Sequence, residues 1–188
     1  MSTDTKINNK IRWGIIGCGN VTEVKSGPAY KNTEGFEIVA VMRRNEAKAK
    51  NYAERHQIKK YYSEAHALIN DNEVDAIYFA TPPDSHKYYA LKVAEAGKIC
   101  CIEKPMTSSY INSLTIYEAF KEKNIPLFIA YYRRSLTRFK KIKKWLNENH
   151  IGDVRHINWT LTKPVSNLDK SDAYNWRTDA KVAPRGVF

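Results

Sequence analysis

Residues 11–22 read IRWGIIGCGNVT, an apolar run followed directly by two closely spaced glycines. The apolar run predicts a buried strand, and Gly17 permits the tight turn that ends it. Gly19 would let a backbone approach a pyrophosphate, and the N–H groups of a following helix would face the phosphates. In the G-x-G-x-x-G fingerprint of dinucleotide-binding turns, the third glycine position is occupied here by Thr22. The match is therefore incomplete, and an ordinary strand-to-helix turn remains an alternative. The predicted dinucleotide contacts are Gly17, Gly19, Asn20 and Val21.

Apolar runs recur along the chain with helical segments between them. The further runs are residues 36–42, 61–62, 76–80, 99–102 and 127–131. Four helices are predicted between them: one capped by Asn45 and ending near 56, one capped by Ser63 and reaching 69 with Glu64 in its first turn, one beginning at Asp84 or Ser85 and ending at Gly97, and a longer one ending near 124. Apolar strands that alternate with helices are typical of a parallel sheet covered on both faces. We therefore predict an α/β fold with a Rossmann, doubly wound parallel sheet.

The pattern changes after Arg134. A helix is predicted to about residue 149, followed by a turn at 151–153 and one long alternating strand at 154–162. These elements predict the entry to a second, α+β domain. Residues 163–188 have no clear period.

Composition narrows the class of protein. The chain has 188 residues, of which 43% are hydrophobic, so it can form a substantial core. No apolar run approaches the roughly 18 residues that span a bilayer, and residues 1–10 lack the apolar segment of a secretory signal. We therefore expect no membrane partner. The three cysteines predict reduced, buried thiols in a cytoplasmic protein. They are Cys18, Cys100 and Cys101.

The formal net charge of +11 raises the question of an anionic partner. The cations are densest in residues 133–144, where apolar residues recur at helical spacing: Leu136, Phe139, Ile142, Trp145 and Leu146. The cations then fall on the solvated side of a helix, and we favour this interpretation over a nucleic-acid surface. We also expect no metal, since four histidines have no partners at metal-ligand spacing: His56, His66, His150 and His156.

The end of the second run bears on the choice of dinucleotide. Sites that prefer NAD place a carboxylate there to accept from the ribose 2′-hydroxyl. Here the position holds Arg43 and Arg44 instead. A guanidinium can grip a phosphate with two hydrogen bonds, so we predict NADP as the favoured cofactor, with NAD as the alternative. Both arginines could also simply face solvent.

Polar residues follow the fourth run, at an edge where open α/β sheets bind ligands. Thr81 and Pro82 come directly after this run and are predicted to lie on the cofactor side. His86 falls in the first turn of the next helix, where the helix dipole disfavours an imidazolium. We therefore expect a neutral His86 with a cofactor-side or structural role.

The fifth and sixth runs end in further polar residues. Glu103-Lys104-Pro105 follows the fifth, and a lysine between a buried strand and a proline is not a typical surface lysine. Tyr131 and Arg134 follow the sixth run. Because parallel strands end at one edge, we expect all these residues to line the same crevice.

Together these motifs resemble the glucose–fructose oxidoreductase / inositol dehydrogenase / rhizopine-catabolism (Gfo/Idh/MocA) family. The resemblance begins near residue 11 and covers nearly the whole chain. It is carried by residues 17–20 (GCGN), 81–83 (TPP) with His86, 96–98 (AGK), 103–105 (EKP), 132–134 (YRR) and 151–154 (IGDV). It implies a Rossmann domain at residues 10–133, and at 134–188 the incomplete start of a C-terminal domain for substrate binding and oligomerisation.

The resemblance also implies roles for individual residues. Lys104 would reach the reacting oxygen and the nicotinamide ribose, where a cation stabilises developing alkoxide charge. Glu103 would orient Lys104, and the bond between Lys104 and Pro105 would be cis, a minority form even before proline. Tyr131 or Arg134 would border the substrate cleft, and Trp176 with Arg177 would approach the cofactor. Catalytic roles are thus expected for Lys104 and Glu103.

Family members continue, after the motif at 176–177, to a glycine-rich turn and then an Asp and a His that supply substrate contact and the general acid/base. Residues 183–188 read APRGVF, which matches that turn at best in part. We expect the general acid/base to lie beyond residue 188. A shortened chain or an interrupted reading frame is favoured over a naturally short protein.

The function implied is NAD(P)-dependent hydride transfer at a hydroxyl or carbonyl group of a sugar, cyclitol or related polyol. A full-length form would assemble as a homo-oligomer. The alternative is a catalytically incompetent nucleotide-binding fragment or an NADP-sensing module.

Overall fold

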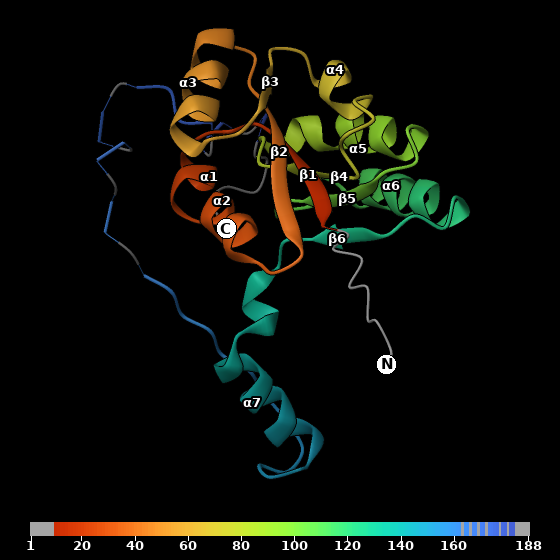
Figure 1. Cartoon of the computed structure of the whole chain (residues 1–188). Coiled ribbons are helices and arrows are strands. Elements are labelled where there is room, and N and C mark those ends of the chain that lie inside the picture. Colours follow the sequence, from red (N-terminus) through yellow and green to blue (C-terminus); the bar gives the residue numbers. More distant parts are fainter. Residues whose placement is uncertain are drawn as a thin grey trace, which may run out of the picture.

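The fold is built on a six-stranded parallel sheet with strand order β3-β2-β1-β4-β5-β6 (Figure 1). The computed structural model describes residues 10–162, 164–165, 167–168, 170–171, 173–176, 178–179 and 181–182. The strands are β1 (Ile11–Ile16), β2 (Phe36–Met42), β3 (Lys60–Tyr62), β4 (Ala76–Phe79), β5 (Ile99–Ile102) and β6 (Leu127–Ile129). This confirms the predicted parallel, doubly wound sheet, whose strand order reverses between β1 and β4.

Helices cover both faces of the sheet. The helices are α1 (Asn20–Val24), α2 (Ser26–Asn32), α3 (Glu46–His56), α4 (Ala65–Ile69), α5 (His86–Glu95), α6 (Tyr110–Glu122) and α7 (Thr137–Asn147), with 3₁₀ turns η1 (Pro83–Ser85) and η2 (Tyr132–Ser135). Figure 1 shows α1, α2 and α3 on one side and α4, α5 and α6 on the other. None of the described helices is long and apolar enough to cross a membrane.

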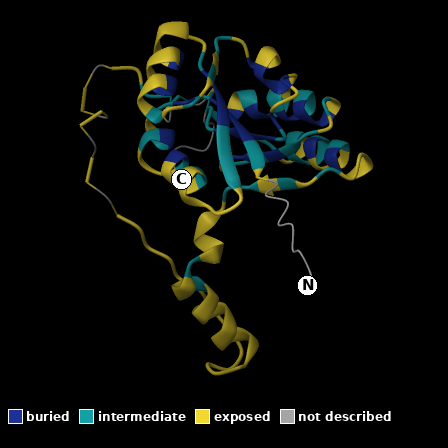
Figure 2. Ribbon diagram, in the orientation of Figure 1, coloured by how far each residue is buried: buried dark blue, intermediate teal, exposed yellow. Residues whose placement is uncertain are grey.

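Each layer of helices encloses its own apolar core. On one face, Leu68, Val93 and Phe120 pack against strand residues such as Ile16 and Phe79. On the other face, Trp13, Tyr52 and Tyr78 belong to a second cluster that Tyr30 and Phe36 complete. Figure 2 shows these buried positions concentrated in the sheet and on the inner sides of the helices. The continuous apolar runs in the sequence follow from burial on both faces.

Two predicted helix starts need correction. Asn45 caps α3 as predicted, since its Oδ1 accepts from the Lys48 N–H at 2.9 Å. Ser63 does not cap α4: the capping position is Glu64, in extended conformation, and the helix begins at Ala65. Asp84 and Ser85, the two predicted starts of α5, lie in the 3₁₀ turn η1. The helix α5 begins at His86, one residue after Ser85.

The predicted long strand at residues 154–162 is wrong, because those residues carry no strand in the structure. They are exposed throughout. A strand forms by pairing its backbone with a neighbour, and among the described residues no strand lies beside this segment. Side-chain alternation alone therefore does not produce a strand here.

The predicted helix after Arg134 is present as α7, and it extends away from the sheet (Figure 1). None of its residues is buried, and Ile142, Trp145 and Leu146 of its apolar side are exposed (Figure 2). Lys141 lies over the Trp145 ring, 5.0 Å from its centroid.

Candidate functional site

The turn after β1 lies against the turn after β4, at the point where the strand order reverses. Gly17 has a φ of +90°, a conformation that favours glycine, and its N–H donates to the Met42 carbonyl oxygen at 2.9 Å. A Cβ on Gly17 would lie 2.7 Å from Thr81 Cγ2 and 3.1 Å from the carbonyl carbon of Ala80. The predicted residues Gly17 and Thr81 are therefore neighbours, and the first glycine serves the packing of the two turns.

Gly19 differs from Gly17 because a Cβ there would meet only the Gly17 oxygen, at 3.8 Å. The space beside Gly19 is open, which is the room a pyrophosphate needs to approach the backbone. Asn20 and Val21 follow at the start of α1, where helix geometry leaves backbone N–H groups without acceptors inside the helix. The turn thus fits the diphosphate of a dinucleotide.

Thr22, which replaces the third glycine of the fingerprint, has a function of its own in this turn. It is buried, and its hydroxyl accepts from the Gly19 N–H at 2.9 Å and lies 2.8 Å from the Gly19 carbonyl oxygen. This is one half of a capping box, the contact from the third helical residue back to the N-cap backbone, because Gly19 has no side chain to make the other half; it takes up one donor of the turn. The Tyr52 hydroxyl donates to the Thr22 carbonyl oxygen at 3.1 Å, which fixes α3 against α1.

The two arginines after β2 are placed differently. Arg43 is half-buried, and its Nη1 donates to the Cys18 carbonyl oxygen at 3.3 Å, so its guanidinium lies over the glycine turn. Arg44 is exposed. Burial raises the pKa of the Cys18 thiol to about 11, although the charge of Arg43 opposes the increase. Cys18 is therefore a protonated core thiol, and Arg43 is the cation held near the predicted phosphate site.

His86 joins the two loops that follow β4 and β5. It has no exposed surface, and its Nε2 lies 2.8 Å from the Thr81 carbonyl oxygen. Its Nδ1 lies 3.1 Å from the carbonyl oxygens of both Pro105 and Met106. Burial lowers the pKa of His86, and these three carbonyl groups oppose that effect. The imidazole thus lies behind the loops and supports them, which is the structural side of the predicted role.

The Glu103-Lys104-Pro105 motif occupies the carboxyl end of β5. Glu103 Oε1 accepts from the Tyr78 hydroxyl at 2.8 Å, and Glu103 Oε2 accepts from the Lys104 backbone N–H at 3.1 Å. The peptide bond between Lys104 and Pro105 is cis, as the family resemblance implies. Lys104 is exposed, two residues beyond the end of β5.

The remaining predicted residues lie at or beyond the end of β6. Tyr131 and Arg134 are exposed, and the Ala130 N–H donates to the Ile102 oxygen at 2.9 Å, so β6 ends beside β5. Tyr132 belongs to the motif at 132–134 but has no predicted role of its own. A hydrogen bond with Arg133 lowers its pKa, and the charges of Lys25 and Lys104 act in the same direction.

Three predicted residues remain, Trp176, Pro82 and Arg177. Trp176 is half-buried in a turn, where its carbonyl oxygen accepts from the Asp179 N–H at 3.3 Å. Pro82 is half-buried just after Thr81. Arg177 lies outside the described residues. No group of three His, Cys, Asp or Glu among the residues that the structure describes could hold a metal ion.

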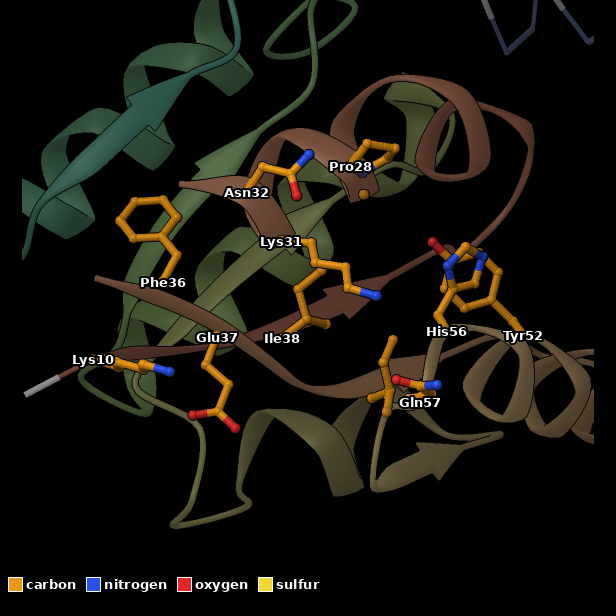
Figure 3. A pocket seen from close by; sticks show the side chains of 12 residues that line it. Lys10, Pro28, Lys31, Asn32, Phe36, Glu37, Ile38, Tyr52, His56 and Gln57 are labelled. Atoms are coloured by element: carbon orange, nitrogen blue, oxygen red, sulfur yellow. The ribbon is translucent and has the colours of Figure 1, made fainter. Parts of the chain in front are cut away.

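A cavity of about 450 Å³ lies elsewhere, at the amino-terminal edge of β1 and β2. Figure 3 shows its lining, which comes from α2, the start of β2 and the end of α3. It includes Lys31, Phe36 and His56 but none of the strand-end residues discussed above. Ligands of open α/β sheets bind at the carboxyl ends of the strands, so we place the candidate site there and not in this cavity.

The chain is similar to known oxidoreductases. Residues 11–131 match a family model described as "Oxidoreductase family, NAD-binding Rossmann fold". Oxidoreductase P35 of Formosa agariphila is 42% identical over 97% of this chain and 57% of its own length. D-xylose 1-dehydrogenase [NADP(+)] of Haloarcula marismortui is 26% identical over 95% of this chain and 50% of its own. The chain thus spans about half the length of the curated relatives it matches.

A solved structure shares the fold at similar coverage. A 3-ketoreductase from Actinomadura kijaniata, in complex with NADP and TDP-benzene, superposes with a TM-score of 0.73 and 26% identity. The match covers 78% of this chain and 45% of the other. The family model spans all six strands of the sheet, from β1 to β6. The chain belongs to the Gfo/Idh/MocA oxidoreductase family.

Proposed function

We propose that the protein is an NADP-dependent oxidoreductase that acts on a hydroxyl or carbonyl group of a sugar, cyclitol or related polyol. The observation that carries the proposal is the position of Lys104, exposed at the carboxyl end of β5 and held there by Glu103. This is the edge of the sheet at which the glycine turn and Arg43 also lie. A bound nicotinamide would supply the hydride donor or acceptor.

The residues of the chain would divide the work between binding and charge stabilisation. The turn at Gly19 would hold the diphosphate, and Arg43 with Arg44 would bind the ribose 2′-phosphate through charge-assisted hydrogen bonds. The Lys104 ammonium would donate to the reacting oxygen and stabilise negative charge as the alcohol loses hydride or the carbonyl gains it. Tyr131 and Arg134 would border the substrate.

Support for NADP comes from the absence of a carboxylate at the end of β2, where residues 43–45 read RRN. Two of the similar proteins carry NADP in their names, the xylose dehydrogenase and the ketoreductase complex. The name of the xylose dehydrogenase supports a sugar substrate, and the name of the ketoreductase supports reaction at a carbonyl group.

The test is a fluorescence titration of the chain with NADPH and with NADH. We expect NADPH to bind at least about tenfold more tightly, which corresponds to about 1.4 kcal/mol. Substituting Arg43→Ala together with Arg44→Ala should remove that preference, and Arg155→Ala, at an exposed position, is the matched control. Equal affinities for both dinucleotides in the unsubstituted chain would rule out the NADP preference. Binding of neither would rule out the proposed function for this chain.

A further inference from the structure

Tyr78 is a polar side chain in the interior of an otherwise apolar strand. It occupies the third position of β4, whose sequence is AIYF, and it is 1% exposed. Its backbone pairs with Cys101 of β5, two residues before Glu103. Its ring packs beside that of Tyr30, with 5.0 Å between the centroids. A phenylalanine would fill the same space, so the hydroxyl needs its own explanation.

The hydroxyl donates to Glu103 Oε1 at 2.8 Å. A buried hydroxyl without a partner is costly, and an ionised carboxylate is an acceptor only, so the two groups match. Burial raises the pKa of Tyr78, partly offset by a hydrogen bond from Ser26, and keeps it a proton donor. The contact therefore fixes one oxygen of the Glu103 carboxylate from inside the sheet.

The second oxygen of Glu103 accepts from the Lys104 backbone N–H at 3.1 Å. The Glu103 carboxylate thus connects the buried strand β4 with the backbone of Lys104. In the proposed function, Lys104 is the residue that donates to the reacting oxygen. On the other side of Lys104, the Pro105 carbonyl oxygen lies 3.1 Å from Nδ1 of the buried His86. Lys104 is held on both sides by groups that are themselves anchored in the core.

We propose that Tyr78 is a positioning residue for Lys104, acting through Glu103. Its hydroxyl holds the carboxylate inward, and the carboxylate holds the Lys104 backbone so that the ammonium points at the reacting oxygen. This inference rests on the proposed function for the role of Lys104. The contacts themselves can be tested without turnover, so the two can fail separately.

The experiment measures the reactivity of individual lysines in the full chain. Trace labelling with acetic anhydride across a pH series, followed by peptide mass spectrometry, gives the apparent pKa and reactivity of Lys104, with Lys87 and Lys98 as internal references. The test variant is Tyr78→Phe. The matched control is Tyr30→Phe, which removes a hydroxyl from the neighbouring ring, where the partner is Cys101 and not Glu103.

We expect Tyr78→Phe to free the Glu103 carboxylate to approach the Lys104 ammonium, stabilise its charge and lower its labelling by about threefold or more, since an opposite charge favours the ionised form. Glu103→Gln should raise the labelling, because it removes that charge. In Tyr30→Phe the labelling of Lys104 should remain unchanged. The labelling of the two reference lysines should remain unchanged in every variant. Unchanged labelling of Lys104 in Tyr78→Phe would overturn the proposal.

The double variant Tyr78→Phe with Glu103→Gln closes the cycle. If Tyr78 acts through Glu103, the phenylalanine should have no further effect in the glutamine background. Additive effects would overturn the proposal, because Tyr78 would then influence Lys104 by another route. An NADPH titration of each variant runs in parallel. Failure of the unsubstituted chain to bind NADPH would count against the proposed function, while the labelling result would still decide the role of Tyr78.

Discussion

Nε2 of His86 lies 2.8 Å from the Thr81 carbonyl oxygen, so the imidazole joins the start of α5 to the loop just before it. Through Nδ1 the same ring contacts the loop that follows β5. Burial lowers the pKa of His86, while the carbonyl groups of Thr81, Met106 and Pro105, together with the charge of Glu103, oppose the decrease. One side chain thus sets the spacing between two loops of the candidate site.

Replacing His86 with Ala should loosen both loops. The change removes a fully buried ring and leaves carbonyl oxygens without a donor, so we expect unfolding to become easier by about 2–4 kcal/mol. NADPH affinity should fall as well, because the Thr81 loop would lose its support. Urea unfolding and NADPH titration measure the two effects. His66→Ala, at an exposed position of α4, is the control and should change neither. Unfolding of His86→Ala at the urea concentration of the unsubstituted chain would contradict this prediction.

Asp71 should make stability depend on pH in the acid range. Burial alone raises its pKa, but hydrogen bonds from Lys60, the Glu73 N–H and Tyr62 outweigh burial and lower the pKa from 3.8 to about 2. Because the pKa is lower in the folded protein, the stabilisation is complete above 3.8 and is lost as the pH falls through about 2. We expect Asp71→Asn to cost about 2 kcal/mol at neutral pH.

Thermal unfolding of the unsubstituted chain and of Asp71→Asn, compared between neutral pH and about pH 2, isolates this contribution. The difference between the two should shrink as the pH falls. A hydrogen bond with Arg55 lowers the pKa of Glu23 to about 2 as well. Glu23 titrates in this range in both proteins, so its contribution cancels in the comparison. Asp153→Asn, at an exposed surface ion pair, is the control. A difference that stays constant with pH would argue against the assigned cause.

The sheet could be predicted from the sequence because its strands are buried on both faces. Runs such as 36–42 and 99–102 have the same bounds in the sequence analysis and in the structure. The strand ends follow from these bounds, so the sequence alone predicts that Gly17, Thr81 and Lys104 lie at one edge of the sheet. The strand at 154–162 could not be judged in the same way, since alternation describes side chains and a strand also needs a partner.

The contacts within the site were less accessible to sequence reasoning. Tyr78 lies in the apolar run at 76–80, where a hydroxyl in a buried strand signals a hydrogen-bond partner. The identity of that partner, Glu103, depends on the pairing of β4 with β5. Ser63 and Glu64 are adjacent, and only the backbone conformation shows which one precedes the helix.

Thr22 should stabilise the glycine turn through its hydroxyl. Thr22→Ala removes the capping contact to the Gly19 N–H, and we expect a loss of about 1 kcal/mol in the free energy of unfolding. Thr22→Ser keeps the hydroxyl and should therefore avoid most of that loss. Chemical denaturation of the unsubstituted chain and of the two variants measures their free energies of unfolding, which should fall in the order unsubstituted, Thr22→Ser, Thr22→Ala. Equal stability of the Ala and Ser variants would mean that the methyl group, and not the hydroxyl, matters at this position.

Gly17 and Gly19 should separate folding from cofactor binding, because their surroundings differ. A Cβ at Gly17 meets Thr81 Cγ2 at 2.7 Å on a backbone with positive φ, so Gly17→Ala should cost about 2–4 kcal/mol of stability.

A Cβ at Gly19 meets nothing closer than 3.8 Å, and its φ of −151° suits an alanine. Gly19→Ala should therefore unfold like the unsubstituted chain. Its methyl group would occupy the space reserved for the pyrophosphate and weaken NADPH binding by about tenfold or more, or about 1.4 kcal/mol. Thermal unfolding and NADPH titration of both variants give the comparison, and full NADPH affinity in Gly19→Ala would place the diphosphate elsewhere.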